Sequence, residues 1–207
     1  MNRIFNYDGP LFGFLDKVAN LFILNILFMV CCIPLFTIGA SVTALNYMML
    51  KIVRGEEGYI VKDFFKAFKE NFKQATAIWL IMALFGVIFG VDFYVLNHMK
   101  LAMSPVIRTV IYALLVVWTF EFVYVFAVLS RFVNTVKQTM KNALLMSIRH
   151  LPWTALLIVV PAAIAAITYV FMYRILPVIF IAGFSGTAYI QAFIYSRIFK
   201  IYETEQA

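Results

Sequence analysis

Two carboxylates lie inside otherwise apolar segments, and these side chains are the best placed in the sequence for intramembrane chemistry. They are Asp92 and Glu121. A carboxylate in hydrocarbon is costly, so each needs a partner or a function. Residue counting places Asn25, Asn46 and Gln191 in the same half of the predicted spans as Glu121. The sequence therefore predicts a polar cluster of Glu121, Asn25, Asn46 and Gln191, which serves either a transport function or only hydrogen bonding between helices.

Asp92 is expected nearer the outer end of its span than Glu121. Arg108 and Arg174 fall at the same predicted depth as Asp92. Opposite charges at one depth in a membrane protein pair with each other. We predict a structural ion pair among Asp92, Arg108 and Arg174, with a ligand site as the alternative.

Motifs for catalysis, cofactors or metals are lacking in this sequence. The two histidines, His98 and His150, fall on opposite sides of the predicted membrane, so they cannot share a metal ion. Cys31 and Cys32 are adjacent and offer no metal-ligand spacing. There is no phosphate-binding loop, dinucleotide glycine motif, HExxH motif or nucleophile elbow. We therefore expect no cofactor, no metal site and no enzymatic activity.

The composition is that of a membrane protein. Hydrophobic residues make up 64% of the 207 residues and charged residues 13%, whereas soluble domains have about 45–50% and about 25%. The formal net charge of +7 does not indicate nucleic-acid binding, because the Lys and Arg residues stand in short connectors between apolar runs. No linker divides the chain, so we predict one integral membrane domain, residues 1–207.

Four apolar stretches account for the predicted spans: residues 18–50, 75–96, 106–130 and 151–196. The middle two each fit one helix of about 20 residues. The first stretch is too long for one span and contains Pro34, which favours a hairpin of two short helices over one long kinked helix.

The last stretch is also too long for one span. Arg174 and Pro177 interrupt it, which predicts two spans, residues 151–173 and 175–196, joined by a tight turn. With the hairpin at Pro34, the expected fold is an all-α transmembrane bundle of six spans in three hairpins.

The distribution of basic residues predicts the orientation of the chain. Residues 51–73 carry six Lys or Arg and residues 131–150 carry four. Two spans separate these connectors, so both lie on one side, which the positive-inside rule makes cytoplasmic. Six spans place fourteen basic residues inside and three outside, whereas five spans give twelve and five. We expect a multi-pass protein of the cell membrane with both termini in the cytoplasm.

The two basic connectors also have helical periodicity. Residues 62–73 predict an amphipathic helix on the membrane surface, with its aromatic side chains toward acyl chains and its lysines toward anionic headgroups. The residues of this helix are Lys62, Phe65, Lys66, Phe68, Lys69, Phe72 and Lys73. Residues 136–149 repeat the pattern more weakly. The bilayer, with its anionic headgroups, is thus the first expected partner.

The N-terminal third resembles a known family. The matching runs are GPL at 9–11, IPLFTIGA at 33–40, LKIVRGEEGY at 50–59 and DFFKAFKENFKQA at 63–75. They are similar to the YesL-like integral membrane family of unknown function (domain of unknown function 624). Length and span layout agree along the whole chain, but only loosely past Leu80.

The resemblance implies a role near sugar uptake, because members of that family are often encoded beside carbohydrate ABC-transporter components. It supplies no catalytic residues. The expected function is an accessory component that associates with the membrane proteins of an ABC transporter or its sensor. The alternative is a small-solute transporter or channel in its own right, motivated by the polar cluster around Glu121.

Overall fold

The computed structural model describes residues 10–56, 58–98 and 105–204, with side chains for residues 15–56, 58–95, 105–171 and 183–203. This described part is all-helical and contains seven α-helices and one 3₁₀ turn, η1. The bounds are α1 Pro10–Cys32, η1 Leu35–Thr37, α2 Ile38–Val53, α3 Ile60–His98, α4 Pro105–Arg131, α5 Val136–Arg149, α6 Leu151–Val170 and α7 Met172–Thr204.

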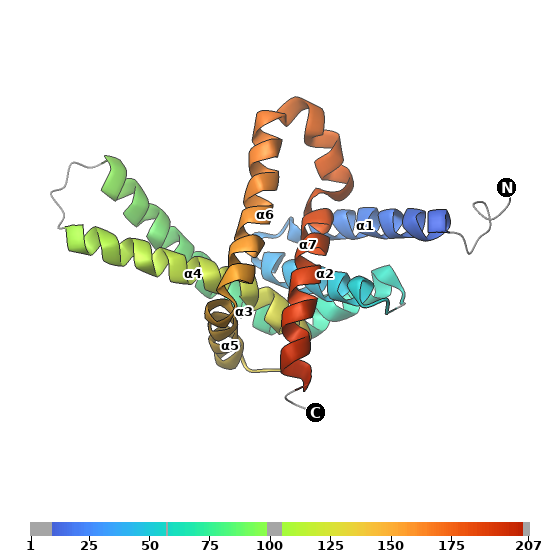
Figure 1. Ribbon diagram of the computed structural model, residues 1–207, viewed down its shortest axis with the longest axis horizontal. Helices are drawn as coiled ribbons and strands as arrows, with labels where there is room; N and C mark the ends of the chain where they lie inside the picture. Colours follow the sequence, from blue (N-terminus) through green and yellow to red (C-terminus); the bar gives the residue numbers. More distant parts are fainter. Residues whose placement is uncertain (1–9, 57, 99–104, 205–207) are drawn as a thin grey trace.

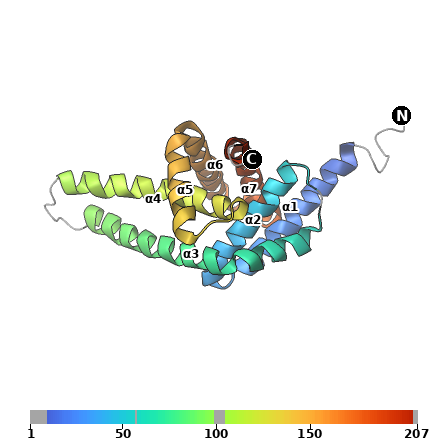
Figure 2. The same cartoon turned by 90° about the horizontal axis from the view of Figure 1, so that it is seen from below.

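The long helices diverge from a common centre as three arms (Figures 1 and 2). One arm is the first part of α1, the second pairs the end of α3 with the start of α4, and the third pairs α6 with the start of α7. The short helix α5 and the C-terminal end of α7 lie at the lower side of Figure 1. Most intramolecular packing is therefore concentrated where the arms meet.

Helix α2 lies at that centre. In its segment Leu35–Val53, 61% of the residues are buried, against 11% in Leu15–Cys32 and 22% in Pro105–Arg131. Small side chains allow this, because Ala40 and Ala44 are fully buried and let neighbouring backbones approach closely. The outer helices keep their apolar side chains exposed, as spans that face lipid do.

Two tyrosines hold α4 and α7 together at the centre. The rings of Tyr124 and Tyr195 meet edge to face with centroids 5.7 Å apart. The Tyr195 hydroxyl donates to the Val123 carbonyl oxygen at 2.7 Å, and the Tyr124 hydroxyl lies 3.0 Å from Thr154 Oγ1 of α6. Every buried hydroxyl of this contact thus has a partner, which an apolar interior requires.

Five described segments are long and apolar enough to cross a membrane. They are Leu15–Cys32, Leu35–Val53, Ile60–Val95, Pro105–Arg131 and Leu151–Val170. The predicted sixth span, residues 175–196, lies in α7, where the side chains of residues 172–182 are outside the described part. The structure therefore fits a multi-pass membrane protein, and the sixth span stays a prediction.

The break near Pro34 is present. Helix α1 ends at Cys32 and α2 begins at Ile38. Between them, the Thr37 hydroxyl donates to the carbonyl oxygens of Cys31 and Pro34. This side chain satisfies carbonyls that a helix end leaves without partners.

Two predicted boundaries differ from the structure. The amphipathic segment 62–73 is no separate helix, because α3 runs unbroken from Ile60 to His98. No Gly or Pro occurs between Ile60 and Phe85, so nothing interrupts the backbone hydrogen bonds. The predicted turn between the last two spans lies earlier than expected, at Phe171. The N–H of Phe171 still donates to the Ile167 carbonyl, and Pro177 lies inside α7.

Candidate functional site

Gln191 fills a gap that a proline leaves in α6. Pro161 lacks an N–H, so the carbonyl oxygen of Leu157, four residues earlier, loses its donor within the helix. The amide Nε2 of Gln191 donates to that oxygen at 3.0 Å, and Leu157 is fully buried. An unpaired buried carbonyl costs about 1–3 kcal/mol, so Gln191 stabilises the contact between α6 and α7.

Asn25 of α1 likewise forms hydrogen bonds with the backbone of α7. Its Oδ1 accepts hydrogen bonds from the N–H groups of Phe184 and Ser185, both at 3.1 Å. An asparagine oxygen on two successive N–H groups is the arrangement of a helix N-cap, here supplied by another helix. Figure 1 shows α7 bending between its upper and lower parts. Asn25 is fully buried, so its role in holding that bend is structural.

Asn46 and Gln191 line one cavity of about 540 Å³ between α1, α2, α6 and α7. Asn46 Nδ2 donates to the Val42 carbonyl oxygen of its own helix at 3.0 Å. Phe184, beside the Asn25 cap, lines the same cavity. Asn46 and Gln191 therefore face one space, whereas Asn25 does not line it and contacts the backbone of Phe184 at its edge.

Glu121 stands apart from this cavity. It is half-buried on α4, one turn before Tyr124, as Gln191 is one turn before Tyr195 on α7. The contact between the two tyrosines thus places Glu121 and Gln191 at one level. Glu121 does not line the cavity, and among the described residues its carboxylate has no hydrogen-bond or ion-pair partner. The structure brings the amides together without the carboxylate.

The predicted ion pair near the other end of the spans is tested only in part. Asp92 is half-buried on α3 and Arg108 is exposed on α4. Within the described ranges these two side chains form no ion pair. The side chain of Arg174 lies outside the described residues, so a pair of Asp92 with Arg174 stays a prediction.

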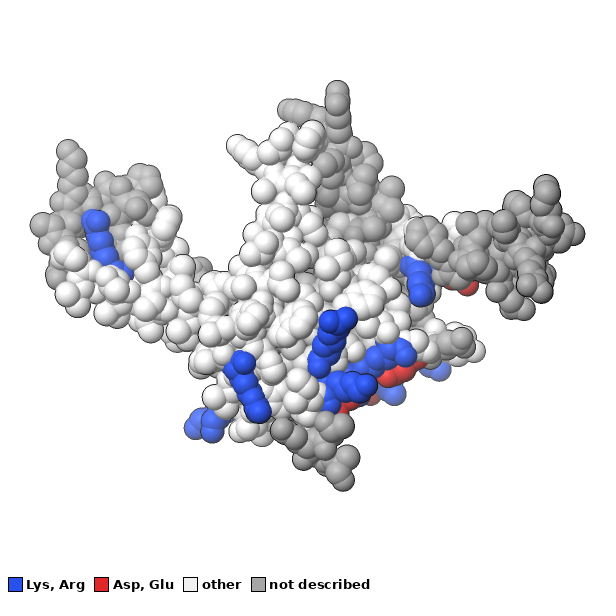
Figure 3. Space-filling model, in the orientation of Figure 1, with Lys and Arg blue, Asp and Glu red and all other residues white. Residues whose placement is uncertain are grey.

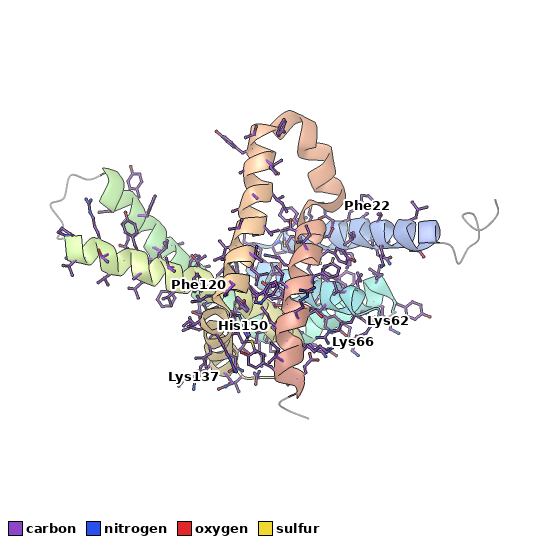
Figure 4. The ribbon with its side chains drawn as sticks, in the orientation of Figure 1. Phe22, Lys62, Lys66, Phe120, Lys137 and His150 are labelled. Atoms are coloured by element: carbon purple, nitrogen blue, oxygen red, sulfur yellow. The ribbon has the colours of Figure 1, made fainter. Side chains whose placement is uncertain are left out.

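Exposed Lys and Arg side chains gather on one side of the molecule, which we name the basic face (Figure 3). They come from the first half of α3, from α5 and from the end of α7, and Lys62, Lys66 and Lys137 all lie in the lower part of Figure 4. The exposed basic side chains that these three segments carry are Lys62, Lys66, Lys69, Lys73, Lys137, Lys141, Arg149, Arg197 and Lys200. Both basic connectors thus meet on one side.

The phenylalanines of segment 62–73 are only partly arranged as predicted. Phe65 is 38% exposed, as expected for a lipid-facing ring. Phe68 and Phe72 instead pack against the protein core, and neighbouring Phe64 is fully buried. The aromatic stripe is therefore mainly a contact with the rest of the protein, because α2 offers an apolar face alongside it. The four lysines remain exposed.

An ion-paired cluster ties four helices together at the basic face. The Glu203 carboxylate of α7 accepts from Arg54 at the end of α2 at 2.8 Å and from Arg131 at the end of α4 at 2.6 Å. Lys51 pairs with Asp63 at 2.7 Å and so joins α2 to the start of α3. This cluster was not predicted from the sequence. The features that could have indicated it are Glu203 and the basic residues at the ends of the spans.

The two arginines also affect the acidity of Glu203. The hydrogen bond from Arg131, with a second from Arg54, lowers the pKa of the Glu203 carboxyl below its ordinary value. Partial desolvation acts in the opposite direction and is the smaller effect overall. The carboxylate is therefore charged, and the cluster intact, at neutral pH.

A glycine turn ends α2 beside this cluster, before the chain continues into α3. Gly55 has φ +71°, a conformation that favours glycine. Its N–H donates to the Ile52 carbonyl, and the N–H of Glu56 donates to the Lys51 carbonyl, both at 3.1 Å. This is a Schellman motif, which ends a helix and satisfies its last carbonyls.

A groove of about 590 Å³ opens on the basic face between α5 and the end of α7. Its polar side chains are Asn134, Gln138, Asn142, Arg149 and Tyr202. The groove also has an apolar part.

Leu145 and Ile148 line the apolar part of the groove and are 55% and 52% exposed. Arg149 lies over the Tyr202 ring at 5.6 Å, and His150 Nε2 is 3.2 Å from the Tyr202 hydroxyl. Desolvation and the neighbouring Arg149 lower the pKa of His150, so the ring is neutral at pH 7. The groove thus combines apolar contact area with fixed polar groups.

Comparison with known proteins gives one match. Residues 21–93 match a known family. It is described as "Protein of unknown function, DUF624". The matching segment covers the second half of α1, all of α2 and α3 as far as Phe93, and so includes Asn25 and Asn46 but not Glu121 or Gln191.

Neither the curated proteins nor the solved structures contain a match to this chain. In the described part of the chain, no three His, Cys, Asp or Glu side chains are grouped as metal ligands. The chain is thus a membrane-type helical protein with one segment that matches a family of unknown function.

Proposed function

We propose that this protein is an accessory component of the cell membrane that binds another membrane protein rather than catalysing a reaction. The observation that carries the proposal is the groove between α5 and α7, whose exposed Leu145 and Ile148 are accompanied by amides and Arg149. Exposed apolar side chains rimmed by polar groups are typical of protein-interaction sites. Glu203 holds α7 against α2 and α4 beside it, so a partner meets a preformed surface.

The resemblance supplies the class of partner, a membrane component of a carbohydrate ABC transporter or its sensor. In this proposal the basic face is cytoplasmic, and its lysines lie among anionic lipid headgroups. The groove then opens toward the cytoplasm, where it is accessible to cytoplasmic segments of the partner.

Co-purification from native membranes tests the docking role. The tagged protein, Ile148→Glu, and Val61→Glu as the matched control are compared; Val61 is 48% exposed on α3 and does not line the groove. We expect transporter or sensor components with the parent protein and with Val61→Glu, and loss of them with Ile148→Glu. Equal recovery with all three proteins, or recovery of no such component, contradicts the proposal.

The alternative function is transport of a small solute, and the cavity lined by Asn46 and Gln191 is the observation in its favour. The described residues that line this cavity carry no charge, and the amides of Asn46 and Gln191 give it hydrogen-bonding groups for a small solute. Flux of sugars or protons into proteoliposomes tests the alternative, and flat traces for both argue against it.

A further inference from the structure

Among the described residues, the lining of the cavity between α1, α2, α6 and α7 is uncharged and mostly apolar. Phe28, Leu45, Pro161, Ile164, Phe184 and Ala188 form much of its wall. Its volume of about 540 Å³ falls within the range of about 300–1,000 Å³ that small-molecule sites occupy. An ionised headgroup is therefore excluded, because burying a charge without an opposite charge is too costly.

The two amide side chains that line the cavity each have an oxygen that accepts no hydrogen bond from a described residue. Asn46 Nδ2 and Gln191 Nε2 are directed at backbone carbonyls. The amide oxygens on the same side chains, Asn46 Oδ1 and Gln191 Oε1, receive no donor from any described residue. Asn46 is only 9% exposed. Neither oxygen is among the buried atoms that lack a partner, so both are open to the cavity. An acceptor that faces hydrocarbon without a donor is unfavourable, so the cavity is suited to a molecule that brings a donor.

The edge of the cavity reaches the outer surface of the helices. Tyr169 and Phe184, which both line it, are 80% and 48% exposed. Asn46 lies eight residues before Arg54, about 12 Å along the helix at 1.5 Å per residue, so the cavity is at the depth of hydrocarbon. A molecule dissolved in the bilayer therefore reaches it without crossing water.

We propose that this cavity binds a neutral lipid-like molecule that bears a hydroxyl or N–H donor, with a long-chain alcohol as its simplest example. The hydroxyl donates to the Asn46 or Gln191 amide oxygen, and the chain lies along α6 from Pro161 to Tyr169. This site is separate from the groove on the basic face, so the inference does not depend on the docking role.

Photo-crosslinking in lipid nanodiscs tests the proposal with the full-length protein. The probe is a twelve-carbon alcohol with a diazirine in its chain, and the competitors are 1-dodecanol, its methyl ether and dodecane. We expect labelled peptides from α6 and α7 around the cavity, and competition by 1-dodecanol that is about fivefold stronger than by the ether, as loss of one hydrogen bond predicts. Labelling spread over the outer helices, or equal competition by the ether, overturns it.

Matched variants separate specific binding from folding defects. Asn46→Leu is compared with Asn71→Leu, since Asn71 Nδ2 makes the same bond to the carbonyl four residues earlier but lies on α3, away from the cavity. Ala188→Phe fills the cavity. We expect weaker labelling in Asn46→Leu and Ala188→Phe but not in Asn71→Leu, with thermal unfolding showing that each variant folds. Unchanged labelling in folded Ala188→Phe contradicts the site.

Discussion

At the scale of single residues, the amide side chains inside the spans form hydrogen bonds with main-chain groups. The sequence analysis grouped Asn25, Asn46, Gln191 and Glu121 by depth. In the structure the first three each hydrogen-bond a main-chain group. Their types and depth were predictable, but their partners were not, because Asn25 and Phe184 are 159 residues apart in the chain.

Replacing Gln191 with Leu tests whether it completes the hydrogen bonding of α6. We expect a loss of about 1–3 kcal/mol in the free energy of unfolding, because the Leu157 carbonyl is left unpaired. In a Pro161→Ala background the new N–H at position 161 can satisfy that carbonyl, so the same change should cost less. Denaturant unfolding of the four proteins measures both costs, and equal costs in the two backgrounds contradict the assignment.

At the scale of helices, close packing of α2 against α3 decides the structure of the amphipathic segment. An isolated stripe of Phe and Lys at helical spacing predicts a membrane-surface helix. Here α2 presents buried Ala40 and Ala44, and the stripe packs against protein instead. Periodicity identified the helix and its lysine face, but it did not distinguish lipid from protein as the neighbour of the aromatic face.

Gly39 is the position where this packing is most sensitive. A Cβ added there lies 2.5 Å from the Ala75 carbonyl oxygen and 2.6 Å from Trp79 Cβ. Because a backbone atom cannot move aside, Gly39→Ala should destabilise the protein by about 1–3 kcal/mol. Gly90→Ala is the control, with no atom within 4 Å of the added Cβ, and helix propensity favours alanine there. In thermal unfolding, the unfolding temperature of Gly39→Ala should lie below that of the parent protein, and that of Gly90→Ala should be equal to it or higher.

At the scale of the whole molecule, Glu203 connects the last helix to two earlier ones. It is 149 residues from Arg54 in sequence and bonds Arg54 and Arg131 together. These contacts join the ends of α2, α4 and α7 on the basic face, whereas the opposite ends of the arms diverge (Figure 1). The cluster is thus a charged connection between arms that the hydrogen bonds of Asn25, Tyr124 and Tyr195 also join.

The pH dependence of stability should reveal this connection. Because the pKa of Glu203 is lowered in the folded protein, its contribution is complete above its ordinary pKa of about 4.3 and is lost as the pH falls through the lowered value. The difference in unfolding temperature between the parent protein and Glu203→Gln should therefore shrink between about pH 5 and pH 3. Glu70→Gln, on exposed α3 surface, should show little difference at any pH. A constant difference for Glu203→Gln speaks against the cluster.

The predicted orientation has a direct test in accessibility mapping. Single cysteines at Lys66 and Lys141, in a background without Cys31 and Cys32, should both react only after the inner face of the membrane is exposed. The two positions lie on the basic face, so they should behave alike. Labelling of the two from opposite sides would show that the topology is wrong.

The sequence by itself determined the membrane-type helical class, the break near Pro34 and the bounds of the helix Val136–Arg149. These follow from composition, proline chemistry and short-range periodicity, which act within a few residues. Three features are seen only in the folded structure. Helix α3 is one helix packed on α2, the Gln191 amide donates to the Leu157 carbonyl oxygen, and Glu203 pairs with two arginines. Such contacts depend on which faces of distant segments meet, and local sequence carries no information on that.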